Sequence, residues 1–203
     1  MAEPLRLILA SGSAARKAML TSAGLTFDVI PADIDEDAIT SMMVTESDCV
    51  EGADVAAVLA MEKASAVARV NPGALVIGSD QVLTLGRRMF SKAATIAEAR
   101  ETLDRLRGRT HELVSAVALA QDDEILWQTV DSAQMTMRKF SDEFLGRYLT
   151  QSGANILRSV GCYELEGPGV QLFERIEGDY FTILGMPMLP LLSELRTRNV
   201  VTA

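Results

Sequence analysis

Two long β-type runs joined by a short turn decide what kind of sheet this chain can build. The segment ELVSAVALAQDDEILWQTVDSAQMTM, residues 112–137, places an apolar run before Asp122-Asp123 and an alternating run after them. Alternation of apolar and polar residues is typical of a half-buried strand, and the Asp pair favours a tight turn. We therefore expect two antiparallel strands here, which a purely parallel sheet cannot contain.

Strand–helix units surround this hairpin. The run LRLILA at residues 5–10 precedes a helical stretch that Gly24 should end, and the run ALVIG at residues 74–78 follows a helical pattern over residues 54–70. Further helices are expected over residues 95–108, 142–151 and 190–198, with a strand near residues 169–174. Such units combined with a hairpin predict an α/β fold with a mixed sheet flanked by helices, whose sites lie beyond the carboxyl ends of strands.

Composition and charge exclude several classes of protein. Hydrophobic residues at 48% and charged residues at 23% are ordinary for a globular chain. We expect one domain over residues 1–203, as a single body or as two lobes around a central cleft. The net charge of -9 argues against binding to nucleic-acid backbones or anionic membranes. No apolar run approaches the ~20 residues of a membrane span, and signal-peptide features are missing, so a cytoplasmic protein is expected.

The cysteines give little support for a metal centre built on sulfur. Cys49 and Cys162 lie far apart, and His111 is the one histidine, so a zinc site is a poor interpretation. We expect two reduced, structural thiols.

The turn after the first strand has the features of an anion site. Ser11 and Ser13 flank a glycine, and Arg16 and Lys17 fall in the first turn of the expected helix. Cations are disfavoured there, because the free N–H groups of a helix start carry partial positive charge. A bound phosphate would resolve the conflict. The alternative is an ordinary serine N-cap with two solvated cations.

Four other charged residues suit a phosphate–metal site when taken together. Asp80 follows the second strand, Glu36 lies in an acidic loop, and Lys92 precedes a helix start. Lys63 interrupts an apolar helical stripe formed by Ala56, Leu59, Val67 and Val70. Each has a plainer interpretation as a turn residue, a solvated charge or a snorkelling lysine. As a set, lysines would bind phosphates and the carboxylates of Glu36 and Asp80 would hold a divalent metal.

A family resemblance connects these positions. The motifs LASGSAARKAML, DIDED, MEKASAVA, VIGSDQVL, SKA, GRTHELVSAVAL and GCYELEGPGVQLFERIEGDYFTILGMP resemble, in order, those of the Maf family of nucleotide pyrophosphatases. The resemblance runs from about Leu7 to Leu195. It implies hydrolysis of a nucleoside triphosphate between the α and β phosphates, giving a monophosphate and pyrophosphate with Mg²⁺ or Mn²⁺.

The resemblance also implies a Maf/ITPase-like elongated, twisted sheet with a cleft at strand carboxyl ends, and a homodimer. It implies roles by position: Ser11, Ser13, Arg16 and Lys17 bind phosphate, Glu36 binds metal, Lys63 and Lys92 are the catalytic lysines, and Asp80 is the metal-binding general base.

Three further positions bear on substrate choice. Gln81 and Glu166 resemble the 7-methyl-GTP branch of the family, and Glu166 is the candidate reader of a guanine edge, since a carboxylate accepts from N1–H and the exocyclic amine. Ala15 departs from the tryptophan usual in that branch and offers no aromatic face to a methylated base. Ala14 and the Ser-Lys-Ala triplet at residues 91–93 also differ from the motifs that are usual in the family.

Two rival functions stay open from the sequence. One is a nucleotide sensor that binds without hydrolysis and regulates cell division. The other is a nucleotidyltransferase, because the first turn is similar to the LAAG-x-G-x-R start of that class. The preferred hypothesis is a hydrolase that removes non-canonical, guanine-type nucleotides.

Overall fold

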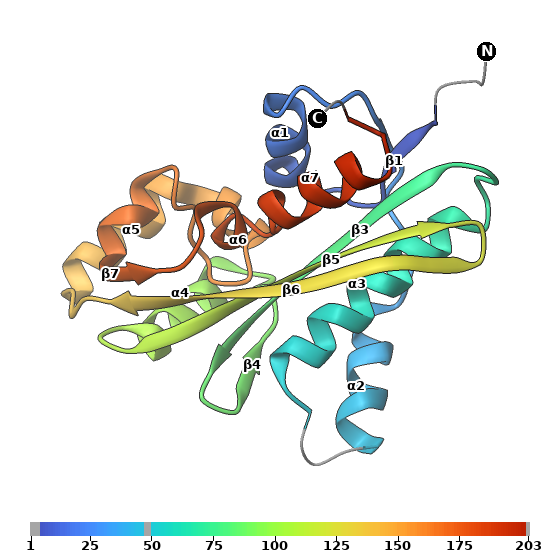
Figure 1. Cartoon of the computed structure of the whole chain (residues 1–203). Helices are drawn as coiled ribbons and strands as arrows, with labels where there is room; N and C mark the ends of the chain where they lie inside the picture. The colour runs from blue at the N-terminus through green and yellow to red at the C-terminus, as the bar shows by residue number, and fades with distance from the viewer. Residues whose placement is uncertain (1–4, 47–49, 202–203) are drawn as a thin grey trace.

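A strongly twisted sheet runs the length of the molecule and carries helices on both sides (Figure 1). The computed structural model describes residues 5–46 and 50–201. Its elements in chain order are β1 (Leu7–Leu9), α1 (Ala14–Ser22), β2 (Asp28–Val29), α2 (Glu36–Glu46), α3 (Gly52–Ala68), β3 (Leu75–Leu85), β4 (Arg88–Phe90), α4 (Ile96–Leu106), β5 (Thr110–Gln121), β6 (Glu124–Met137), α5 (Asp142–Ser152), the 3₁₀ segments η1 (Gly153–Arg158) and η2 (Pro168–Leu172), β7 (Phe173–Glu177), α6 (Tyr180–Ile183) and α7 (Met188–Thr197).

The sheet is mixed, which confirms the expected fold class. Its strand order is β2-β1-β3-β5-β6-β7, and β4 pairs with β3. β1 lies parallel to β2 and β3, whereas the pairs β3–β4, β3–β5, β5–β6 and β6–β7 are antiparallel. The predicted hairpin is β5–β6, and Asp122 turns it with a φ of 54°, a conformation that Asp tolerates better than most residues.

Apolar side chains on the two faces of β3 pack against different helices. Val76 and Val82 pack with α3, because successive side chains of a strand point to opposite faces. Leu75 and Ile77 face the other way and pack with α1 and α7. A third apolar cluster joins α4, α5, η1 and η2 at the end of the sheet near β7. The face that carries α3 and the face that carries α7 can be followed in Figure 1.

The structure corrects two predictions that concern the site. The second strand does not stop at Gly78: β3 continues to Leu85, because β5 pairs with it from Leu75 to Thr84 and β4 pairs with its last three residues. Asp80 therefore lies in the middle of a strand. Glu36 is the first residue of α2 and not part of a loop, and the Asp35 carboxylate accepts a hydrogen bond from the Ala38 amide at 2.9 Å to start that helix.

Smaller differences occur at element ends. The segment near residues 169–174 is mostly η2, and β7 follows it. α7 begins before Pro190, and Val70 falls beyond α3, where it is 73% exposed. Cys162 is a buried free thiol, as expected, whereas Cys49 lies outside the described residues. No helix in the described ranges combines the length and apolar character that a bilayer crossing requires.

Candidate active site

One edge of β3 has a gap in its strand pairing. β5 occupies the other edge from Leu75 to Thr84. On the gapped edge, β1 pairs with residues 75–77 and β4 with residues 83–85. Among the described residues, no strand pairs with positions 78–82 on this side. Strand peptide groups exposed in this way need other partners, and Asp80 lies at the centre of the gap.

Arg16 closes part of this gap from the first turn of α1. Its Nη1 donates to the Ser79 carbonyl at 2.8 Å and to Ser11 Oγ at 3.2 Å, and its Nε donates to the Gly185 carbonyl at 2.9 Å. The side chain is buried. Burial lowers the pKa of the Arg16 guanidinium, and the charges of Asp80 and Glu36 oppose that shift. The position of Arg16 at the start of α1 is therefore explained first by its hydrogen bonds to two backbone carbonyls.

Ser13 has the N-cap role that the plainer interpretation assigned to it. Its hydroxyl accepts from the Arg16 amide at 3.4 Å, and its own amide donates to Ser11 Oγ at 3.3 Å. The two serines and Arg16 form one connected turn. The same residues can cap a helix and shape an anion-binding loop, since both uses depend on N–H groups and hydroxyls at a helix start.

Lys63 joins the two candidate carboxylates. Its Nζ lies 2.6 Å from Asp80 Oδ1 and 2.8 Å from Glu36 Oε1. The side chains of Lys63 and Asp80 are buried, whereas that of Glu36 is 47% exposed. The charge on the apolar stripe of α3 therefore points at the sheet and does not snorkel. Three elements that are distant in the sequence contribute to this cluster.

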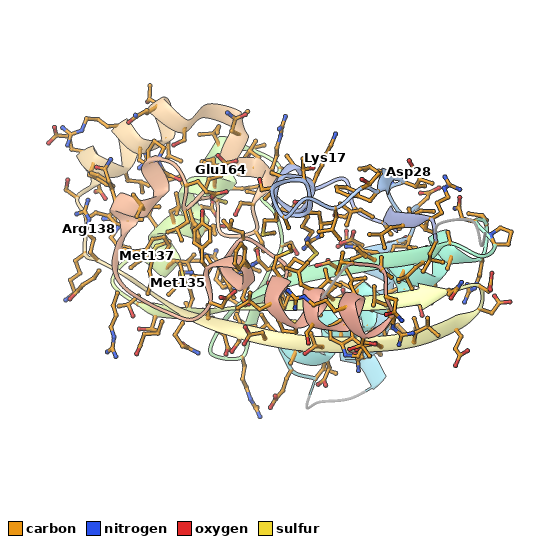
Figure 2. The ribbon with its side chains drawn as sticks, turned by 45° about the horizontal axis from the view of Figure 1, so that its top comes forward. Lys17, Asp28, Met135, Met137, Arg138 and Glu164 are labelled. Atoms are coloured by element: carbon orange, nitrogen blue, oxygen red, sulfur yellow. The ribbon has the colours of Figure 1, made fainter. Side chains whose placement is uncertain are left out.

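Three predicted residues stay at the surface. The side chains of Lys17, Lys92 and Glu166 are exposed, and within residues 5–46 and 50–201 no hydrogen bond or ion pair engages them. Figure 2 shows Lys17 on the outer side of α1. Ala15 is half-buried in the same helix. Their roles toward a substrate stay predictions.

Gln81 lies on the face of β3 opposite Asp80 and is held by the protein. Its Nε2 donates to Ser115 Oγ at 3.0 Å and to the carbonyls of Thr182 and Ile183 at 3.1 and 3.0 Å. These contacts fasten β3 to α6, the helix that precedes Gly185. The amide nitrogen of Gln81 is therefore engaged within the fold.

Sequence reasoning missed the contribution of Gly185. Its carbonyl accepts from Arg16 Nε and, at 3.0 Å, from Ser79 Oγ. Its φ is 104°, a conformation that favours glycine. The signal was present in the glycine-rich block that ends in TILGMP, but spacing alone does not show which strand a carbonyl faces.

Glu36 and Asp80 have the chemistry of a divalent-metal site in part. Two carboxylates are hard oxygen ligands that suit Mg²⁺ or Mn²⁺, and Mg²⁺ usually takes its remaining ligands from water and phosphates. The described residues hold no group of three or more His, Cys, Asp or Glu side chains placed for a metal. The donors therefore fit a metal that arrives with a phosphorylated substrate. Formally, the charges of Arg16 and Lys63 cancel those of the two carboxylates.

Comparison with known proteins identifies the relatives of this chain. A chain from Mesorhizobium japonicum named 7-methyl-GTP pyrophosphatase is 52% identical over 196 residues, which cover 97% of this chain and 98% of the relative. A nucleoside triphosphate pyrophosphatase from Granulibacter bethesdensis is 48% identical over 198 residues, 98% of this chain and 100% of the relative.

A solved HAM1 protein from Coxiella burnetii has a TM-score of 0.43 at 19% identity, covering 66% of this chain and 73% of that one. A family model described as Maf-like protein matches residues 6–198. The family match and the full-length identities confirm the resemblance seen in the motifs, and the chain belongs to the Maf family.

Proposed function

We propose that this protein hydrolyses a nucleoside triphosphate to a monophosphate and pyrophosphate. The observation that carries the proposal is the meeting of Arg16, Lys63, Glu36 and Asp80 at the open edge of β3. Full-length relatives named for the pyrophosphatase activity support it. An acidic protein needs such a local set of cations to accept a polyphosphate.

Asp80 is the proposed general base. Lys63 engages Oδ1, and in the described part of the chain no hydrogen bond or ion pair reaches Oδ2. Oδ2 can accept a proton from the water that attacks the α phosphorus, while Lys63 holds the carboxylate in position. General bases of this kind contribute ~10²–10⁴-fold to a rate.

Cations at different depths have different tasks in this mechanism. Arg16 commits Nε and Nη1 to protein oxygens, so it mainly fixes the loop of Ser11 and Ser13 and leaves Nη2 for phosphate. The exposed Lys17 and Lys92 meet the triphosphate from solvent. Phosphoryl transfer depends chiefly on such positioning and electrostatic stabilisation.

Glu36 and Asp80 are the proposed ligands of Mg²⁺ or Mn²⁺. A bound divalent cation would polarise the phosphate oxygens and neutralise charge on the leaving pyrophosphate. Because the side-chain charges of this cluster cancel one another, the positive charge of the metal would offset the negative charge of the triphosphate.

The proposed substrate is a guanine-type, non-canonical nucleotide, and the physiological role is its removal in the cytoplasm. Ala15 supplies no aromatic contact to a methylated base, so guanine is expected to matter more than the methyl group. We also propose a homodimer, which light scattering after size-exclusion chromatography tests.

A nucleotide panel tests the activity. Purified protein is incubated with canonical and methylated triphosphates and Mg²⁺ or Mn²⁺, and pyrophosphate release is measured. Release from guanine-type triphosphates is expected. Tight binding without release would favour the non-hydrolysing regulator, and turnover that requires a sugar phosphate would favour the nucleotidyltransferase.

A further inference from the structure

A row of polar residues crosses the sheet on the face that carries α1 and α7. Gln81 on β3 pairs with Ser115 on β5, and Ser115 pairs with Asp131 on β6. Farther along these strands the same face is apolar, at positions such as Ile77 and Leu119. Polar groups inside a protein need hydrogen-bond partners, and Ser115 is fully buried. The row therefore needs a polar partner from an element that covers it.

Thr182 of α6 supplies that partner. Its hydroxyl donates to Asp131 Oδ2 at 2.7 Å, and its carbonyl accepts from Ser115 Oγ at 2.8 Å and from Gln81 Nε2 at 3.1 Å. Thr182 is fully buried, and α6 lies on the same side of the sheet as α1 and α7 (Figure 1). A single residue of α6 is thus hydrogen-bonded to three adjacent strands.

The same threonine sets the position of Gly185. Besides the two side chains, the Thr182 carbonyl accepts from the Gly185 amide at 3.0 Å. The Met186 amide donates to the Phe181 carbonyl at 3.1 Å and closes the turn that ends α6. Gly185 adopts its φ of 104° in this turn, as glycine often does just after a helix. The Gly185 carbonyl therefore projects from a turn that Thr182 fastens to the sheet.

The Gly185 carbonyl in turn orients Arg16. It accepts from Arg16 Nε at 2.9 Å and from Ser79 Oγ at 3.0 Å. A guanidinium is planar, so holding Nε at one carbonyl also fixes the directions in which its terminal nitrogens donate. A displaced carbonyl would change how Arg16 presents these nitrogens to a phosphate. The contacts that begin at Asp131 and pass through Thr182 therefore end at the phosphate-binding turn.

The proposed general base lies outside this chain of contacts. Asp80 and Lys63 meet on the other face of β3, where α3 packs. A disturbance of α6 should therefore reach the bound phosphates through Arg16 and leave Asp80 in place. We propose that Thr182 is a positioning residue, which holds the Gly185 carbonyl and through it the Arg16 guanidinium that meets the triphosphate. This inference rests on the proposed function.

The test compares two threonines. Thr182→Val keeps the shape of the side chain and removes its hydrogen bond to Asp131. Thr150→Val is the matched control, because the exposed Thr150 hydroxyl donates to the Gly146 carbonyl within α5. With GTP and Mg²⁺, Thr182→Val should raise KM about five- to thirtyfold, a range typical of residues coupled to a site without touching its ligand. Thr150→Val and Thr182→Ser, which keeps the hydroxyl, should have near-normal KM values.

The kinetic constants separate a positioning role from general damage to the fold. The kcat of Thr182→Val should change less than about threefold, because a loss of binding common to the ground and transition states appears in KM. Arg16→Lys keeps the charge and loses Nε, so adding Thr182→Val to it should raise KM less than about twofold further. Independent, multiplying effects of the two changes would overturn the inference. A normal KM in Thr182→Val, or a fall in kcat as large as the rise in KM, would do so too.

Two further measurements cover a variant that does not fold and an enzyme that does not turn over. Asp131→Ala removes the same hydrogen bond from an exposed position and should raise KM to a similar extent, and a normal KM in it would contradict the assignment. Calorimetric binding of inorganic triphosphate should weaken about five- to thirtyfold in Thr182→Val. If wild type hydrolyses no nucleotide, the proposed function fails. Absent binding by wild type, or equal binding by Thr182→Val, overturns the inference separately.

Discussion

Asp80 on β3 and His111 on β5 are both buried titratable residues, yet their surroundings differ in charge. Asp80, 7% exposed, contacts the ammonium of Lys63, which also contacts a half-exposed glutamate. His111, 1% exposed, has Nε2 at 2.7 Å from the Tyr163 hydroxyl, and within the described residues Nδ1 has no partner. Burial lowers the pKa of His111 to about 4 and raises that of Tyr163.

The comparison shows that burial of a polar group does not by itself mark a functional site. The Asp80 cluster holds charges of both signs beside an unpaired strand edge, where a charged substrate can exchange contacts with them. The His111–Tyr163 pair lies among apolar and aromatic side chains such as Phe173. A neutral pair in that setting supports the core.

Replacing Asp80 should have the largest effect on activity. Asp80→Asn keeps the shape of the side chain and should lower kcat by at least ~10²-fold, because the proposed general base is lost. His111→Gln, with its amide near the Tyr163 hydroxyl, is the matched change in the other region and should keep normal turnover per folded molecule. Pyrophosphate release by both variants gives the answer, and near-normal turnover by Asp80→Asn would exclude it as the base.

Removing Lys63 should show that the charged cluster depends on its cation. Lys63→Met leaves the Asp80 carboxylate buried beside Glu36, and breaking a buried ion pair on one side costs about 3–5 kcal/mol of unfolding free energy. The lower end is expected because Glu36 is half exposed. Urea unfolding measures the loss.

The double variant Lys63→Met with Asp80→Leu supplies the control for that experiment. It replaces both buried charges with apolar groups and should recover most of the stability while staying inactive. Equal stability of wild type and Lys63→Met would mean that the pair is not maintained in solution.

The pH dependence of the unfolding free energy should show that the His111–Tyr163 pair is neutral in the folded protein. The ordinary pKa of His111 is 6.5 and the folded value is about 4. The unfolded chain therefore binds the proton first as the pH falls, so the stabilisation is present above pH 6.5 and is lost toward pH 4. Between pH 7 and pH 5, wild type should lose roughly 2 kcal/mol more than His111→Gln. Parallel pH curves for the two proteins would contradict this assignment.

The exposed lysines should give the smallest effects. Lys17→Ala and Lys92→Ala should leave the melting temperature unchanged and raise KM for the triphosphate two- to fivefold, as expected from ~0.5–1 kcal/mol for an exposed ion pair. The effect should shrink at high salt. A 10²-fold rise in KM for either variant would show that the substituted lysine lies closer to the reacting phosphate than its exposure in this structure indicates.

Much of the fold follows from local sequence pattern. The Asp122-Asp123 turn, the strand run before it and the alternation after it located the β5–β6 hairpin, because a strand has a period of two residues. Lys63 within an apolar stripe indicated an inward-facing cation for the same kind of reason, since helical spacing reports which face a side chain shares. Four of the candidate site residues that the motifs singled out, Arg16, Glu36, Lys63 and Asp80, do meet.

The sequence by itself determined the family, the mixed sheet and the set of charged residues worth testing, because these depend on residue types and short spacings. Only the tertiary structure decided where β1 stops and β4 begins along β3, and hence that Arg16 binds the carbonyls of Ser79 and Gly185. Pairing registers and close backbone approach arise between distant segments, which no local pattern encodes.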